Sequence, residues 1–129
     1  MNKRVIVFFV LSLLFPIYLS GTPLVWLSWN DGVKEAAKTG KPIMLEAMSS
    51  SCHYCIKMQE EVFDDSEMAV LIQEHYIPVR INVTNTEMPF GIRVKMTPTF
   101  YFFSSTLKRL KTIRGTWNQE DFIDILLHI

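Results

Sequence analysis

The chain has 129 residues, of which 49% are hydrophobic and 20% are charged, so its composition is that of one globular domain and not of a disordered segment. Thirteen basic residues balance thirteen acidic residues, and this balance leaves no basic surplus for a nucleic-acid backbone. The chain has two cysteines, which exclude a cystine-stapled scaffold and a four-thiolate zinc site.

Residues 1–21 have the layout of a secretory signal peptide. A short positive end precedes residues 5–15, where ten of eleven residues are apolar, and two small residues close the segment. An uncleaved inner-membrane anchor formed by residues 5–20 is the alternative, although this stretch is shorter than the roughly 20 residues of a spanning helix. Both alternatives predict export to the periplasm, with residues 22–129 as the folded domain.

The spacing of apolar residues after the leader predicts alternating helices and strands. The expected elements are a helix capped by Asn30 or Asp31, a strand over 42–48, a helix from 52 through 62, a further helix from a cap at 64–66 to 76, a strand over 77–83, a turn and short helix over 84–95, strands over 96–103 and 107–114, and a last helix capped by Asn118. The residues expected to be buried in the last two elements are Leu110, Ile113, Phe122, Ile123, Leu126 and Leu127. This order predicts a small three-layer α/β sandwich in which helices flank a central mixed β-sheet.

Both cysteines lie in the run Cys52-His53-Tyr54-Cys55, at the expected start of a helix. This spacing places the two thiols about one helical turn apart. Unpaired N–H groups and the helix dipole favour a thiolate at the first position, and a protonated His53 would add to this effect. Cys52 is therefore the candidate nucleophile toward a substrate disulfide, and Cys55 is the candidate that resolves the mixed disulfide.

A structural disulfide, a haem-attachment site and a metal site are the alternatives to a redox dithiol. A structural disulfide across so short a loop would remove little entropy from the unfolded chain. Covalent haem attachment needs a histidine directly after the second cysteine, where the chain has Ile56. Zinc or Cu(I) could bind the two thiols and His53 with help from Met48 and Met58, as in a metal chaperone, although the methionine spacing also fits a helix core.

Two motifs resemble those of the thioredoxin superfamily, and the resemblance covers residues 28–128. The first is the Cys-x-x-Cys run at a strand-to-helix junction. The second is the sequence Phe-Gly-Ile-Arg-Val-Lys-Met-Thr-Pro-Thr-Phe over 90–100, which is similar to the family's stretch that leads to Thr-Pro-Thr. The resemblance implies a thioredoxin-like fold and an exported thiol–disulfide oxidoreductase. It also implies protein disulfides or dithiols as substrates, without a cofactor or a bound metal.

The resemblance further implies that Thr97–Pro98 is a cis peptide that faces the dithiol and docks the substrate backbone. A proline inside an apolar strand is unusual because it cannot donate to the sheet, and cis bonds are essentially confined to proline. An ordinary edge-strand proline is the alternative. His53 and Tyr54, between the cysteines, complete the expected substrate-binding set.

Glu46 lies six positions before Cys52 within an otherwise apolar strand, where the resemblance implies a buried carboxylate. Burial without a partner is costly and should raise the pKa of this carboxyl. A carboxylate of this kind could exchange protons with Cys55 while that thiol attacks. The alternative is that Glu46 points to solvent or pairs with a lysine.

Several features bear on the direction of electron flow. The family's Trp-Cys lead into the dithiol is replaced by serines 49–51, while Tyr54 and Thr97 match periplasmic disulfide isomerases. Those isomerases have a separate dimerisation domain, for which the 108 residues after the leader have no room, so we expect a monomer. Residues 28–83 resemble the exported single-domain branch that includes reductase domains. We therefore predict a reductase with a membrane electron-transfer partner; a disulfide oxidant and a redox-silent binding module are the alternatives.

Overall fold

The structure, a computed structural model, describes residues 23–129. The predicted signal peptide or anchor over 1–21 lies outside the described residues, and the domain boundary at residue 22 stays a prediction. Within the described residues, no helix combines the length and the apolar character that crossing a membrane requires.

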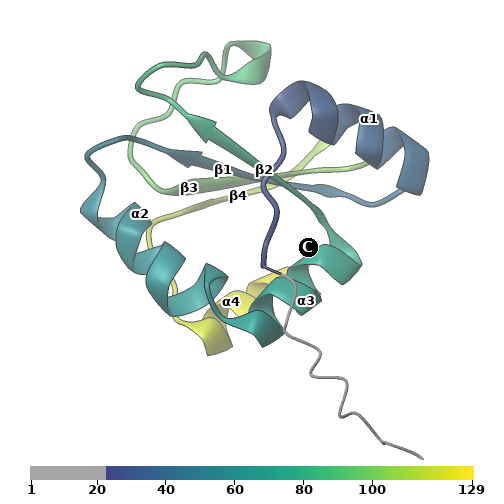
Figure 1. Ribbon diagram of the computed structural model, residues 1–129. Coiled ribbons are helices and arrows are strands. Elements are labelled where there is room, and N and C mark those ends of the chain that lie inside the picture. The colour runs from purple at the N-terminus through teal and green to yellow at the C-terminus, as the bar shows by residue number, and fades with distance from the viewer. Residues whose placement is uncertain (1–22) are drawn as a thin grey trace, which may run out of the picture.

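A mixed four-stranded sheet forms the middle of the fold (Figure 1). β1 (Ile43–Met48) pairs in parallel with β2 (Ile77–Asn82) on one side. On its other side β1 pairs antiparallel with β3 (Thr99–Phe103), which pairs antiparallel with β4 (Arg109–Arg114) at the edge. The spatial order is therefore β2-β1-β3-β4, which confirms the predicted mixed sheet.

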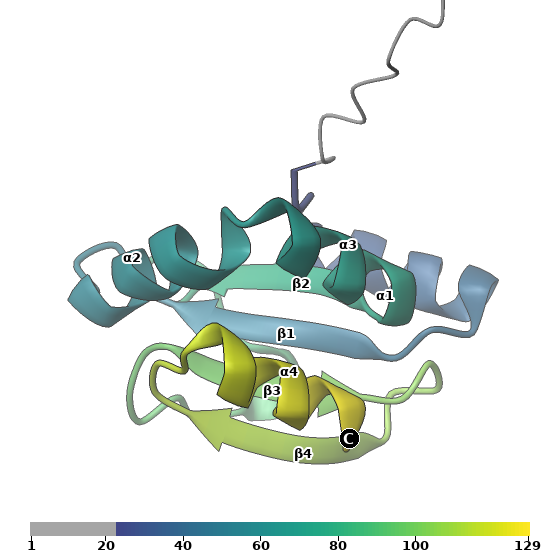
Figure 2. The same cartoon turned by 90° about the horizontal axis from the view of Figure 1, so that it is seen from below.

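Helices cover both faces of this sheet. α1 (Trp29–Thr39) lies on one face. α2 (His53–Met58), α3 (Ser66–His75) and α4 (Gln119–Leu127) lie on the other, which is the face nearer the viewer in Figure 2. The predicted three-layer α/β sandwich is confirmed.

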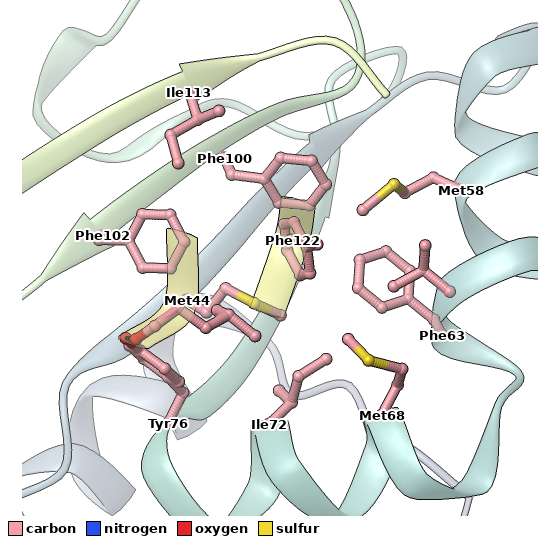
Figure 3. Packing of buried hydrophobic residues seen from close by; sticks show 12 residues of the cluster. Met44, Met58, Phe63, Met68, Ile72, Tyr76, Phe100, Phe102, Ile113 and Phe122 are labelled. Atoms are coloured by element: carbon pink, nitrogen blue, oxygen red, sulfur yellow. Dashed lines mark hydrogen bonds between the residues drawn. The ribbon is translucent and has the colours of Figure 1, made fainter. Parts of the chain in front are cut away.

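The alternation of side chains along β1 divides the core into two clusters. Ile43, Leu45 and Ala47 pack on the side of α1. Met44 belongs to the larger cluster on the other face, which is drawn in Figure 3. Aromatic and methionine side chains from β3, α4 and the helices after β1 fill that cluster, among them Met58, Phe63, Met68, Phe100, Phe102 and Phe122. Because β1 is buried on both faces, its sequence is nearly continuous apolar residues, and Glu46 is its single charged residue.

The helix caps agree with the prediction at two of three helices. The side chains of Asp65 and Asn118 each accept a backbone N–H bond at the start of α3 and α4, as expected. The prediction for α1 is wrong: the cap is Ser28, whose Oγ accepts from the Asp31 N–H at 3.2 Å, and Asn30 lies inside the helix. Serine, asparagine and aspartate are all good caps, so the composition alone did not fix the first turn.

Three expected elements differ from the structure. The helix after the cysteines changes to a π-helical segment over Gln59–Phe63. The short helix expected within 84–95 is one 3₁₀ turn, Pro89–Gly91. The strand expected from residue 96 begins only at Thr99, because the segment that contains Pro98 bends and a proline cannot donate to the ladder.

Two of the expected core residues, Leu110 and Leu127, are exposed, so their prediction is wrong. Leu110 and Ile113 are an odd number of positions apart on an edge strand, so alternation places them on opposite faces. Leu127 is in the last turn of α4, one position beyond the buried side. The remaining expected residues are buried, namely Ile113, Phe122 and Leu126, or half-buried, namely Ile123.

Candidate functional site

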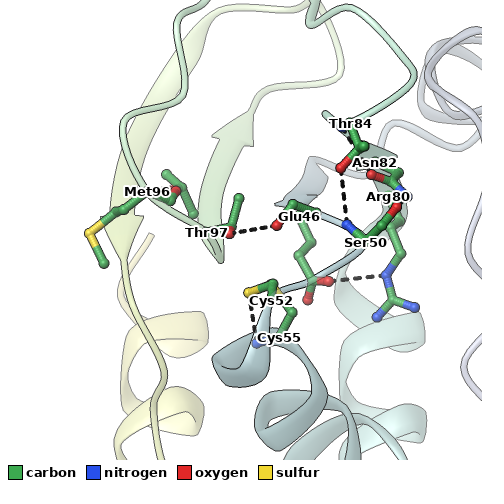
Figure 4. Close-up of a disulfide and its surroundings, with 11 residues drawn as sticks. Glu46, Ser50, Cys52, Cys55, Arg80, Asn82, Thr84, Met96 and Thr97 are labelled. Atoms are coloured by element: carbon green, nitrogen blue, oxygen red, sulfur yellow. Dashed lines mark hydrogen bonds and ion pairs between the residues drawn. A yellow bond between two sulfur atoms is a disulfide. The ribbon is translucent and has the colours of Figure 1, made fainter.

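The two cysteines form a disulfide at the start of α2 (Figure 4). Cys52 is the cap residue of this helix, and its Sγ accepts a hydrogen bond from the Cys55 backbone N–H at 3.0 Å. The Cα atoms of the pair are 5.2 Å apart. Only 7% of Cys52 and 4% of Cys55 are exposed, so the sulfur atoms are shielded from most of the solvent. The predicted proximity of the two sulfurs is confirmed, and the pair can pass between a disulfide and a dithiol.

The two residues between the cysteines are exposed on the first turn of α2. The rings of His53 and Tyr54 meet edge to face with their centroids 5.5 Å apart. Both side chains are open to solvent beside the disulfide, which is a position where they can meet a partner protein.

Glu46 is buried directly behind the disulfide. Only 1% of the residue is exposed, and its Oε1 accepts a hydrogen bond from the Arg80 Nε at 3.0 Å. Its Oε2 is buried and has no hydrogen-bond partner among the described residues. The carboxyl lines a pocket of about 330 Å³ together with Cys52, Cys55 and Arg80. The alternative of a solvent-facing Glu46 is therefore wrong, and its cationic partner is an arginine and not a lysine.

Burial raises the pKa of Glu46 from its ordinary 4.5 to about 7. The main cause is the loss of hydration of the charged form, and the positive charge and hydrogen bond of Arg80 act against it. The expected increase of the pKa is confirmed in direction. A carboxyl with this pKa changes its protonation near neutral pH, which suits a group that accepts and returns a proton.

Arg80 is a site residue that the sequence analysis missed. It stands opposite Glu46 in the parallel register of β2 and β1. Its guanidinium also donates to the Gln59 Oε1 and lies over the ring of Trp26, with 4.0 Å between its Cζ and the ring centroid. The one available signal was a charged residue within the apolar strand Ile-Pro-Val-Arg-Ile-Asn, but the sequence does not specify which residue faces it across the sheet.

The Thr97–Pro98 peptide bond is cis, as the resemblance implies. Pro98 is buried, and it precedes β3 instead of lying inside a strand. The Oγ1 of Thr97 lies 3.1 Å from the Oγ of Ser49, so this loop is tied to the segment that leads into Cys52 (Figure 4).

The serines before Cys52 connect three parts of the site. While Ser49 contacts Thr97, the Ser50 backbone N–H donates to the Thr84 Oγ1 at 3.0 Å, and the Asn82 side chain donates to the Ser50 Oγ at 2.9 Å. These residues replace the family's Trp-Cys lead, and the structure gives them the role of holding the dithiol segment between the Pro98 loop and the end of β2.

Met48 and Met58, the two methionines considered as soft metal ligands, have different surroundings. Met58 is buried in the large core cluster, while Met48 lines the pocket beside the disulfide. Within residues 23–129, no three side chains of the His, Cys, Asp and Glu types are grouped so as to hold a metal ion.

Comparisons with known proteins agree with this fold. The family model for a thioredoxin-like domain matches residues 29–129. Spermatogenesis-associated protein 20 from Homo sapiens is 34% identical over 76 residues, which are 58% of this chain and 9% of that protein. The chain thus spans less than a tenth of the length of the first curated relatives that it matches.

Two solved structures share the arrangement of the whole domain. The DsbH oxidoreductase superposes with a TM-score of 0.69 at 20% identity, covering 84% of this chain and 85% of that chain. A thioredoxin from Thermus thermophilus superposes with a TM-score of 0.70 at 23% identity, covering 82% and 86%. Both similarities confirm the predicted thioredoxin-like fold, which here carries a redox-type cysteine pair.

Proposed function

Because the chain belongs to the thioredoxin-like domain family, we propose that it is an exported thiol–disulfide oxidoreductase that acts on protein disulfides through Cys52 and Cys55. One observation carries the proposal: the disulfide shares a pocket with the buried, partly unpartnered carboxyl of Glu46. A disulfide that only braced the fold would need no titratable group behind it. The similarity to the DsbH oxidoreductase supports the same class of reaction.

The reaction begins with the reduced protein. The Cys52 thiolate attacks one sulfur of the substrate disulfide, a mixed disulfide forms, and the other substrate sulfur leaves as a thiolate. Cys55 then attacks the Sγ of Cys52. The mixed disulfide breaks, the Cys52–Cys55 disulfide forms, and the second substrate thiolate is released. Two electrons pass from the dithiol to the substrate, and the substrate thiolates take up two protons.

Glu46 serves the second step as a proton acceptor. Cys55 is almost fully buried, so bulk water is a poor base for its thiol. The Glu46 carboxylate takes this proton, directly or through a water in the shared pocket, and its pKa of about 7 lets it release the proton near neutral pH.

Substrate binding involves the surface around Cys52. The Thr97–Pro98 loop, tied to Ser49, provides a fixed backbone edge for an extended substrate segment. His53 and Tyr54 project from the first turn of α2 and contact the substrate side chains.

The direction of electron flow is toward the substrate, so the protein is a periplasmic reductase kept reduced by a membrane electron-transfer partner. A buried carboxylate disfavours a nearby thiolate, which destabilises the dithiol form and makes it a better reductant. The resemblance of residues 28–83 to exported reductase domains supports the same direction.

Trapping of mixed disulfides tests the roles of the two cysteines. In tagged full-length protein produced in an exporting host, Cys55→Ser should accumulate covalent complexes that dithiothreitol releases, because Cys52 attacks but nothing resolves the product. Cys52→Ser and the double variant are the controls. Complexes with Cys52→Ser but not with Cys55→Ser would reverse the two roles, and none with either variant would contradict the proposed activity.

The direction is tested by the redox state in cells. Acid quenching followed by thiol alkylation should find Cys52 and Cys55 mainly reduced when the membrane electron supply is intact. A pool that is mainly oxidised under that condition would identify an oxidant instead of a reductase.

A further inference from the structure

We propose that Trp26 is a positioning residue for the exchange reaction, because its indole ring holds the Arg80 guanidinium on one oxygen of Glu46 and leaves the other oxygen free toward the disulfide. This inference rests on the proposed function. It adds a role for residues 23–27, the segment that precedes the cap of α1.

The guanidinium of Arg80 is held from several sides. Its Nε donates to the Glu46 Oε1 at 3.0 Å, and its Nη2 donates to the Gln59 Oε1. The ring of Trp26 lies 4.0 Å from its Cζ, and the ring of Phe63 lies 6.0 Å away. The Arg80 side chain is 24% exposed, so removal of the indole would open a path for the guanidinium toward solvent and leave it held by its hydrogen bonds alone.

Trp26 stays over Arg80 because both of its neighbours in the chain are anchored. The Val25 N–H donates to the Gln73 Oε1 on α3 at 3.2 Å. Leu27 forms a parallel bridge with β2: its N–H donates to the Pro78 carbonyl at 2.9 Å, and its carbonyl accepts from the Arg80 N–H at 3.2 Å. The segment is therefore fixed on α3 and on β2, and the side chain between these anchors lies on the arginine.

The chemistry of the indole suits this role better than simple packing. The Trp26 Nε1 is buried without a hydrogen-bond partner in the described part of the chain, which is a cost that a phenylalanine would not carry. The Trp26 and Phe63 rings are nearly perpendicular with 4.9 Å between their centroids, while the Arg80 guanidinium lies over the ring of Trp26. Tryptophan is the side chain that attracts a cation most strongly through its ring face.

The position of Arg80 matters because few charges face Glu46. The other acidic groups of the pocket are the carboxylates of Glu60 and Asp64, and the thiols of Cys52 and Cys55 join them only when the disulfide is reduced. Asp64 is engaged by the Gln59 amide at 2.7 Å. Among the described residues that line the pocket, Arg80 is the only cation, so its placement decides how strongly the negative form of Glu46 is favoured.

The test measures the titration of Glu46 in the full-length oxidised protein, by carboxyl-selective NMR, for wild type, Trp26→Phe and Trp26→Leu. Trp29→Leu is the matched control, because this tryptophan packs on Phe90 and Phe103, away from the pocket. Trp26→Leu should raise the Glu46 midpoint by roughly one pH unit, the size expected for losing a partly desolvated cation–π contact. Trp26→Phe should give a smaller rise, and Trp29→Leu none.

The pH profile of disulfide exchange gives the second measurement, and its midpoint should move with that of Glu46. An unchanged Glu46 midpoint in both Trp26 variants, with a loss of stability like that of Trp29→Leu, would reduce Trp26 to a packing residue and overturn the inference. If the midpoint moves but wild type exchanges no disulfide, the placement of Arg80 on Glu46 by Trp26 stands, while its role in exchange fails together with the proposed function. If exchange occurs and the midpoint does not move, the positioning role alone fails.

Discussion

The buried carboxyl of Glu46 should make the oxidised protein less stable as the pH rises from 4.5 to above 7. Its pKa is about 7 in the fold and 4.5 in an exposed carboxyl, so the folded state binds this proton more tightly than the unfolded chain. The stability that this group contributes is fully present below pH 4.5 and is lost as the pH rises through 7. The difference of 2.5 between these two values corresponds to about 3 kcal/mol.

Urea unfolding of oxidised wild type and Glu46→Gln, measured at intervals from pH 4.5 to 8, isolates this contribution. Other groups titrate in both proteins, so the difference between the two unfolding free energies follows Glu46 alone. This difference should change in favour of the glutamine variant by about 3 kcal/mol across the range. Glu74→Gln changes an exposed residue on α3, so its unfolding free energy should depend on pH in the same way as that of wild type.

Two outcomes would refute the reasoning. If the difference between the unfolding free energies of wild type and Glu46→Gln does not change with pH, burial does not raise the pKa of Glu46. A difference that changes in the opposite direction, with wild type gaining stability as the pH rises, would mean that the attraction of Arg80 outweighs the loss of hydration.

Three further predictions concern exchange and packing. Glu46→Gln should slow disulfide exchange chiefly near neutral pH, and an unchanged rate–pH profile would exclude a proton relay. A double-mutant cycle with Ser49→Ala and Thr97→Val should show a coupling of about 1 kcal/mol in urea unfolding, the value of a half-buried hydrogen bond, and additive effects would contradict that bond. Gly32→Ala should destabilise the fold by about 1–3 kcal/mol, because its Cβ would lie within van der Waals overlap of the Val79 side chain, and urea midpoints equal to wild type would contradict this close packing.

The parts of the site that the sequence predicted depend on local patterns. A Cys-x-x-Cys run at the end of an apolar strand defines both the helix start and the closeness of the two sulfurs, because both follow from residues within one turn. The burial of Glu46 was implied by the family resemblance and fits its place in an otherwise apolar strand, although the strand alone left a solvent-facing side chain open. The same local logic located the cap Asn118 and placed the cap of α3 within 64–66, where it is Asp65.

The parts that the sequence did not predict depend on contacts across the sheet. Arg80 faces Glu46 through the register of two strands that are 34 positions apart. Trp26 is placed beside Arg80 by a single bridge between Leu27 and Val79. A single bridge leaves no repeating pattern of apolar residues in the sequence, so the contact could not be predicted. The error at Leu110 is of another kind, because alternation with Ile113 along one strand already places the two side chains on opposite faces.

In the proposed function, the central strand separates the groups that control the proton of Glu46 from those that bind the substrate. In β1, Glu46 pairs with Arg80 of β2 on one side and with Phe100 of β3 on the other. The cation therefore reaches the carboxyl from the β2 side, while the loop before β3 reaches the dithiol segment through the Ser49–Thr97 contact. The groups that set the proton affinity of Glu46 are fixed by the sheet register, whereas the groups proposed to bind the substrate are on the Thr97–Pro98 loop and on the exposed first turn of α2. The proposed function therefore predicts that changes at His53 and Tyr54 alter which disulfides are bound without moving the charges that face Glu46.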